Sequence, residues 1–119
     1  MSTPYSTEQI ENLKRHCKKL SAFQEGNITY LLMEGTAMPS GCSPSECDTV
    51  FCPKDRGDGY ASRLFFAQKV AGPYTRNWHL TARLAERNWE AFSWRVDNAS
   101  SLTLEELLNE HLSAIVRPQ

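Results

Sequence analysis

The chain has 119 residues, of which 40% are hydrophobic and 23% are charged, and its 13 Lys and Arg against 14 Asp and Glu give a net charge of −1. This composition is typical of one globular domain spanning residues 1–119, and it excludes a disordered charged tail. Because there is no basic excess to neutralise phosphates, we do not expect nucleic-acid binding. Apolar runs such as 31–33 and 64–67 are far too short for a membrane span or a secretory signal, so we expect a cytoplasmic protein.

The first predicted element is a helix that begins after Ser6 and extends to a stop at Gly26. Ser6 can cap its N-terminus, with Gln9 as the capping-box partner three residues later. The apolar residues that follow recur at helical spacing: Ile10, Leu13, Cys17 and Leu20. Basic residues occupy the other faces, as is typical of a solvated helix surface: Lys14, Arg15, Lys18 and Lys19.

Four or five strands are predicted in the middle of the chain. Their β-branched, aromatic and aliphatic residues fall in the ranges 27–33, 49–52, 63–70, 78–84 and 89–96. Glycine and proline residues predict loops at 34–46 and 54–59. The last two strand ranges also suit a helix, because Leu80, Leu84 and Trp89 fit helical spacing.

The final predicted element is a helix that begins after Thr103. Thr103 and Glu106 have the spacing of a capping box, and Leu102 can pack against Leu107. A broad apolar stripe then continues to Val116. A helix, a run of strands with short links and a second helix predict an α+β fold, in which an antiparallel meander sheet is flanked by an N-terminal and a C-terminal helix.

Four cysteines are available for thiol or metal chemistry: Cys17, Cys42, Cys47 and Cys52. Their spacing matches none of the usual zinc motifs, and on one strand Cys47 and Cys52 would point to opposite faces. We therefore expect no metal site, and no disulfide in a reducing compartment. Cys17 and Cys52 are interpreted as core residues. Cys42, in a loop rich in glycine and proline, is the cysteine with the exposure that a nucleophile requires.

The histidines and tryptophans offer fewer candidates. His16 and His111 are interpreted as packed or surface residues, whereas His79, at the start of a predicted strand, is the best candidate for a functional imidazole. No nucleophile elbow or phosphate-binding glycine loop is present. Core packing explains most of the aromatic cluster between Trp78 and Trp94, and one exposed member could anchor a protein partner.

The order of elements and several short segments together resemble the ubiquitin-conjugating (UBC) enzyme fold, and more closely its divergent bacterial relatives. The segments are 39–44 (PSGCSP), 48–50 (DTV), 59–66 (GYASRLFF), 77–79 (NWH) and 89–94 (WEAFSW). The third stands where the family has a Tyr-Pro stretch, and the fourth roughly where it has His-Pro-Asn. Trp89 or Trp94 would match the tryptophan that precedes the family's following helix.

The resemblance implies a transferase of a bacterial ubiquitin-like conjugation pathway, without a cofactor. Such a protein receives the activated C-terminus of a ubiquitin-like protein from an activating enzyme and passes it to a target amine. Those two proteins are the implied partners. By resemblance, the basic face of the first helix, with Arg15, Lys18 and Lys19, would dock the activating enzyme.

One departure from the family leaves the nucleophile open, because no cysteine follows Cys52 and the family's usual position falls within 87–93. Ser93 could accept the C-terminus as an oxyester, with His79 as its base and Asn77 or Asn88 as an oxyanion donor. Cys42 could instead have taken over the role. Alternatively, the domain could be a non-catalytic adaptor, like RWD domains and other variant relatives of this fold.

Overall fold

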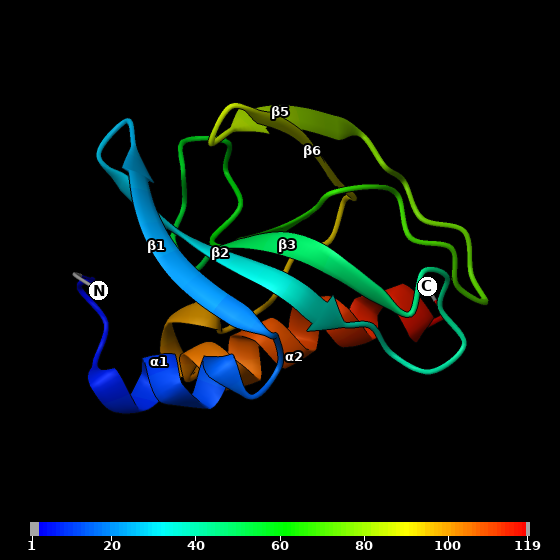
Figure 1. The fold of residues 1–119 in the computed structure, drawn as a ribbon. Coiled ribbons are helices and arrows are strands. Elements are labelled where there is room, and N and C mark those ends of the chain that lie inside the picture. Colours follow the sequence, from blue (N-terminus) through cyan, green and yellow to red (C-terminus); the bar gives the residue numbers. More distant parts are fainter. Residues whose placement is uncertain (1–2, 119) are drawn as a thin grey trace.

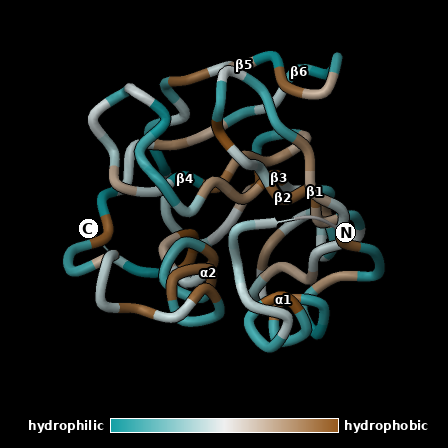
Figure 2. The backbone as a smooth tube through the Cα atoms, turned by 90° about the vertical axis from the view of Figure 1, so that its left-hand side faces the viewer, coloured by the Kyte–Doolittle hydropathy of each residue, from teal (hydrophilic) through white to brown (hydrophobic). Residues whose placement is uncertain are grey.

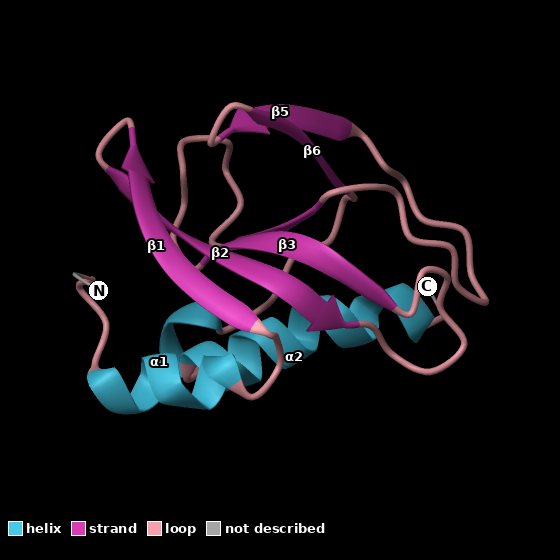
Figure 3. Ribbon diagram, in the orientation of Figure 1, coloured by secondary structure: helices cyan, strands magenta, loops and turns pink. Residues whose placement is uncertain are grey.

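A computed structural model describes residues 3–118 of the chain. It has six strands and two α-helices, and Figures 1 and 3 show the strands above the helices. The elements are α1 (Thr7–Lys14), β1 (Lys19–Glu25), β2 (Ile28–Ala37), β3 (Glu46–Cys52), β4 (Arg63–Phe66), β5 (Leu80–Leu84), β6 (Arg87–Ala91) and α2 (Leu104–Ser113), with 3-10 turns at Ala99–Ser101 and Ala114–Val116. Neither helix within 3–118 is long and apolar enough to span a membrane.

The strands form one antiparallel sheet in the order β1-β2-β3-β4-β6-β5. The predicted α+β class, an antiparallel sheet with an N-terminal and a C-terminal helix, is confirmed. The strands follow a meander from β1 to β4, after which β6 rather than β5 pairs with β4. β4 and β6 are joined at a single residue pair, Phe66 with Glu90. This narrow junction lets the β5–β6 hairpin turn away from the plane of the other strands, so the sheet curls over itself (Figure 1).

Two hydrophobic cores lie on the two faces of the sheet. The helix-side core joins α1 and α2 to the strands, and the hairpin-side core lies between the central strands and the β5–β6 hairpin. In Figure 2, α1 and α2 run beneath the strands and both carry hydrophobic turns. The most deeply buried members of the helix-side core include Leu13, Met33, Phe51, Phe66, Leu108 and Ile115, and those of the hairpin-side core include Val50, Cys52, Phe65 and Trp89.

The predicted length of the first helix is wrong. α1 ends at Lys14, and β1 starts at Lys19. A two-residue turn at Gly26 and Asn27, both with positive φ (58° and 66°), pairs β1 with β2 as a hairpin. The backbone pairing with β2 therefore outweighs the helical spacing of Cys17 and Leu20 that suggested a longer helix.

The cap of α1 is partly as predicted. Ser6 Oγ accepts a hydrogen bond from the Gln9 backbone N–H at 3.2 Å. The Gln9 side chain, however, turns to the other helix, where its Oε1 accepts from Leu104 N at 2.8 Å. Gln9 thereby links the two helices at the start of α2.

The second helix is confirmed in detail. Thr103 Oγ1 accepts from Glu106 N, and Glu106 Oε1 accepts from Thr103 N, which completes the predicted capping box. The last three predicted strands are shorter in the structure: β4 ends at Phe66 instead of position 70, β5 begins at Leu80 instead of position 78, and β6 ends at Ala91 instead of position 96. The segments that come before Arg63 in β4 and after Ala91 in β6 lie outside the sheet, and these two segments shape the candidate site.

Candidate functional site

A tyrosine and a serine from two separate segments form the centre of the candidate site. Tyr60 precedes β4 and Ser93 follows β6, and their hydroxyl oxygens are 3.0 Å apart. Both residues are half-buried. Ser93 is held from a third segment, because its backbone N–H donates to the carbonyl of Asn77 at 2.8 Å. The structure thus brings together three of the segments that carry the family resemblance.

Two guanidinium groups lie against the ring of Tyr60. The distance from Cζ to the ring centroid is 3.6 Å for Arg63 and 4.0 Å for Arg95, within the range of a cation–π contact. Arg95 also donates to the carbonyl of Gly59 at 2.7 Å, which ties it to the loop that carries Tyr60. Two cations therefore lie over the ring whose hydroxyl contacts Ser93.

Asp58 holds Arg63 in place from the same loop. Its Oδ2 accepts from Arg63 Nε at 2.8 Å and lies 3.7 Å from Arg56 Nη1. Partial burial acts to raise the pKa of Asp58, but the hydrogen bonds from Arg63 and from Tyr60 N, with the charge of Arg56, lower it below its ordinary value. Arg95 has no ion-pair partner within 3–118. Around Tyr60 there are therefore three cations, Arg56, Arg63 and Arg95, and one paired carboxylate, Asp58.

His79 lies beside this cluster but does not bond to Ser93. Its side chain is exposed, and its Nε2 is 3.1 Å from Arg63 Nη1. Since a guanidinium only donates, Nε2 accepts this hydrogen bond and carries no proton in this arrangement. The group within reach of the Ser93 hydroxyl is Tyr60, a role that the sequence did not indicate, and the His79 ring lies 6.0 Å from the ring of Tyr60.

The second predicted site residue in this segment, Asn77, is exposed. Its backbone carbonyl contacts Ser93, and no hydrogen bond of its side chain occurs within residues 3–118. Asn88, the alternative oxyanion donor, lies in β6, where its Oδ1 accepts from Arg83 at 3.3 Å. Asn77 is therefore the asparagine next to the cluster.

An open hollow lies beside the loop that carries Tyr60. It has a volume of about 560 Å³ and is lined by Gly59 and Ala61, the neighbours of Tyr60, and by Ala99 and Ser100 from the first 3-10 turn, among others. The rest of its lining is Pro53, Lys54 and Asp55, and the hollow is open to one side. This shape suits an extended peptide better than a compact cofactor, since a compact ligand needs an enclosed site.

None of the cysteines has the surroundings of an activated thiol. Burial raises the pKa of all four thiols above the ordinary value, in the case of Cys42 despite its loop position. Cys42 is half-buried rather than exposed, which corrects its predicted exposure. As predicted, Cys47 and Cys52 point to opposite faces of the sheet, into the helix-side and hairpin-side cores respectively. Within 3–118, no three His, Cys, Asp or Glu residues are placed to hold a metal ion.

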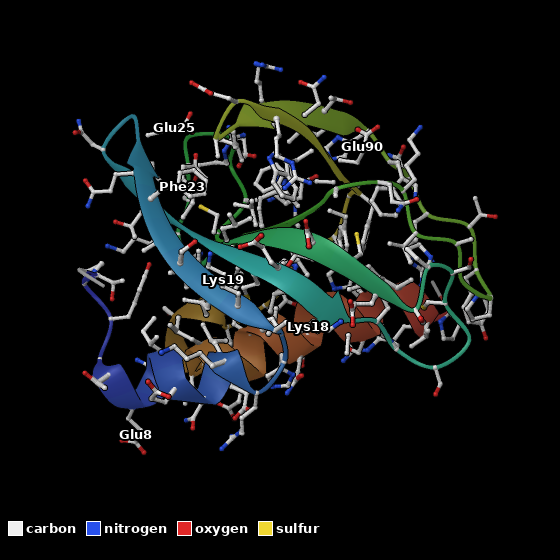
Figure 4. All side chains as sticks on the ribbon, viewed as in Figure 1. Glu8, Lys18, Lys19, Phe23, Glu25 and Glu90 are labelled. Atoms are coloured by element: carbon white, nitrogen blue, oxygen red, sulfur yellow. The ribbon has the colours of Figure 1, made fainter. Side chains whose placement is uncertain are left out.

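The predicted basic helix face is not a single surface. Arg15 caps α1 and donates to both carboxylate oxygens of Glu105 at 3.0 and 3.1 Å. Lys18 lies in the connection to β1 and pairs with Glu46 at 3.0 Å, whereas Lys19 belongs to β1 itself. Figure 4 shows Lys18 and Lys19 at the start of β1.

His111, predicted to be packed or at the surface, is buried in the helix-side core. Its Nε2 lies 2.7 Å from the hydroxyl of Ser62, also buried. Burial first, and then the charge of Arg63, lower the pKa of His111 to about 4. The imidazole is therefore neutral near pH 7, and Ser62 supplies its hydrogen-bond partner.

Comparisons with protein-family models, with curated proteins and with solved structures each found no match to this chain.

Proposed function

We propose that this chain is a UBC-like module of a bacterial ubiquitin-like conjugation pathway, and that it binds its partners without carrying a thioester. The observation that carries this proposal is the state of the thiols. Burial raises the pKa of each cysteine, and the segment where the family keeps its nucleophile holds Ser93 instead. A thioester carrier needs an accessible thiolate.

The UBC-like part of the proposal is supported by the arrangement of the elements. The order of a capped helix, a meander of strands, an irregular segment and a second helix is the order on which the resemblance rests. Three of the resembling segments, which carry Tyr60, Asn77 and Ser93, converge at one place. The open hollow beside Tyr60 offers room for an extended C-terminal tail.

A second candidate function is transfer through an oxyester on Ser93. The observation that favours it is the 3.0 Å contact between the Ser93 and Tyr60 hydroxyls, beside the guanidiniums of Arg63 and Arg95. Ser93 Oγ would form a bond to the carbonyl carbon of the activated C-terminus, and the bond to the leaving group on the activating enzyme would break. The Ser93 proton would pass through Tyr60 to that leaving group.

One experiment separates the two functions. The protein is incubated with a bacterial activating enzyme, its ubiquitin-like protein and ATP, and covalent adducts are resolved by mass spectrometry. We expect association without an adduct. An adduct removed by hydroxylamine, resistant to thiol reductant and absent in Ser93→Ala would establish the oxyester. An adduct removed by reductant and absent in Cys42→Ala would overturn both candidates in favour of a thioester carrier.

The docking residues implied by the resemblance have a test of their own. Charge reversal at Arg15, Lys18 or Lys19 should weaken binding to the activating enzyme and reduce its salt dependence. Lys69→Glu is the matched control, since Lys69 is also exposed and gives the same change in net charge. Equal losses in the control and in the three variants would exclude a local docking surface.

A further inference from the structure

The outer edge of β1 is open. Among residues 3–118, β1 is the first strand in the sheet order and pairs with β2 alone. Figures 1 and 2 both show it at one side of the molecule. Its seven residues contain neither proline nor glycine, and its pairing with β2 from Lys19 to Glu25 has no register shift. Long regular edges of this kind are templates for another strand, and proteins usually protect them.

The turn at the end of β1 determines which backbone groups face outward. The turn at Gly26 and Asn27 closes on the pair Glu25 and Ile28, and in a two-residue hairpin this pair is hydrogen-bonded. Alternate residues therefore direct their N–H and C=O groups toward β2, beginning with Glu25. The residues between them direct theirs to the open edge: Leu20, Ala22 and Gln24.

We propose that β1 pairs with β1 of a second copy of this chain, antiparallel and about a two-fold axis at Ala22. In this register Ala22 faces Ala22, and Leu20 faces Gln24 of the second copy. These are the residues whose backbone groups are free on both strands, so each facing pair can exchange two hydrogen bonds. A shift of one residue would place free groups opposite groups already bonded to β2.

The charges of β1 select the same register. Lys19 lies near one end of the strand and Glu25 near the other (Figure 4). Pairing centred on Ala22 sets each Lys19 opposite Glu25 of the second copy, so two opposite-charge pairs form. A shift of two residues would leave these charges unmatched. The strand is thus complementary to itself in both hydrogen bonding and charge.

The side chains of Lys19 and Glu25 can both still bind a charged partner. Lys19 forms no ion pair with any residue from 3 to 118, whereas its neighbour Lys18 is paired with Glu46. Glu25 Oε2 accepts a hydrogen bond from Ala85 N at 2.6 Å, which fixes the carboxylate near the end of the strand. Its other oxygen can accept from the lysine of a second copy.

A two-fold contact of this kind closes as a dimer, whereas β1 against the opposite edge, β5, would propagate into a filament. Because one pair of strands buries less area than a standard interface, we expect a weak, concentration-dependent dimer. The purified protein alone is sufficient for the test, so its outcome is independent of the proposed function.

The test is sedimentation velocity over about 5–1,000 µM protein, with charge variants. We expect a monomer–dimer equilibrium in the wild type, weakened about tenfold or more in Lys19→Glu and in Glu25→Lys, because both ends then carry like charges. An equimolar mixture of the two variants should dimerise like the wild type, since the mixed dimer has opposite charges at both ends. This recovery also shows that neither variant is misfolded.

Lys69→Glu serves as the control for net charge and should dimerise like the wild type. Amide exchange gives a second measurement. The amides of Leu20, Ala22 and Gln24 should exchange more slowly as concentration rises, whereas Phe23, bonded to β2, should be protected at every concentration. A monomer up to the highest concentration, or a filament, or a dimer unaffected by both charge variants, would overturn the proposal.

Discussion

The two faces of the sheet are covered by different means. On one face two capped helices pack onto the strands through many aliphatic side chains, and a buried polar pair, Ser62 and His111, lies among them. On the other face the sheet covers itself, and the β5–β6 hairpin packs through fewer residues around the fully buried Trp89. The Trp89 indole N–H donates to Leu84 O at 2.9 Å, inside the same hairpin.

This difference explains where the candidate site lies. β4 and β6 meet at one residue pair, and the segments before β4 and after β6 carry Tyr60 and Ser93. The position of the hairpin on the sheet therefore sets the distance between these two hydroxyls. A change that loosens the hairpin-side core should reach the site, whereas one in the helix-side core should act mainly on overall stability.

Truncation of one fully buried side chain on each face compares the two cores directly. Trp89→Ala should lower the free energy of unfolding by about 3–5 kcal/mol, and Leu108→Ala, in the helix-side core, by about 2–5 kcal/mol. Urea denaturation followed by far-UV circular dichroism measures both. If the two faces fold as one unit, each variant shifts a single transition. A separate early transition in Trp89→Ala alone would show that the hairpin unfolds by itself.

Acid should destabilise the folded chain through the helix-side core, because His111 is buried there in its neutral form. Its pKa is about 4 in the folded chain against an ordinary value of 6.5. The unfolded chain therefore binds more protons between these values, and stability present above pH 6.5 is lost as the pH falls toward 4. The loss amounts to roughly 3 kcal/mol.

The double variant Ser62→Ala/His111→Leu is the control for this titration. It removes both members of the buried pair, so no hydroxyl is left without a partner. Its free energy of unfolding, measured by urea at pH 7 and at pH 4.5, should change less than that of the wild type. Equal changes in the two proteins would mean that other groups, such as Asp58 or Glu105, produce the acid sensitivity.

The turns of the two hairpins have the same backbone form but different residues. Gly26 and Asn27 suit positive φ, whereas Ala85 (φ 50°) and Glu86 (φ 62°) pay a steric cost in the β5–β6 turn. Ala85→Asn/Glu86→Gly should therefore stabilise the chain by about 1–2 kcal/mol, raising the melting temperature by a few degrees. Gly26→Ala is the converse control and should destabilise; no gain in the double variant would contradict the assigned turn.

Local signals made the helix-side face largely predictable. The capping box of Thr103 and Glu106 and the apolar stripe after it are contiguous in the sequence, and the structure confirms both. The predicted N-terminal helix is too long because Cys17 and Leu20 fit helical spacing. Leu20 instead belongs to a hairpin strand, whose formation depends on pairing with β2. Pairing energy between separate segments leaves little trace in a local pattern.

The candidate site was predictable only in part for the same reason. The resemblance pointed to Ser93, Asn77 and His79, and the structure places all three near one another. The resemblance did not assign a role to Tyr60, which lies in one of its segments, or to Arg95, which directly follows another. Their convergence depends on the single β4–β6 contact and on the curl of the sheet, which no spacing within a segment encodes.

The smallest difference in stability between the two faces should come from their exposed ion pairs. Arg87 Nη1 lies 3.4 Å from Asp48 Oδ2, and its Cζ is 4.4 Å from the centroid of the Trp89 ring. Arg15 forms an ion pair with Glu105 across the two helices, and among residues 3–118 its guanidinium lies over no aromatic ring. Exposed pairs contribute little, so Arg87→Met and Arg15→Met should each cost less than about 1 kcal/mol. Arg87→Met should cost more, and part of its loss should persist at 1 M salt, because the contact with the Trp89 ring is screened less than the ion pair. Equal costs that both vanish in salt would show that Arg87 stabilises the hairpin through charge alone.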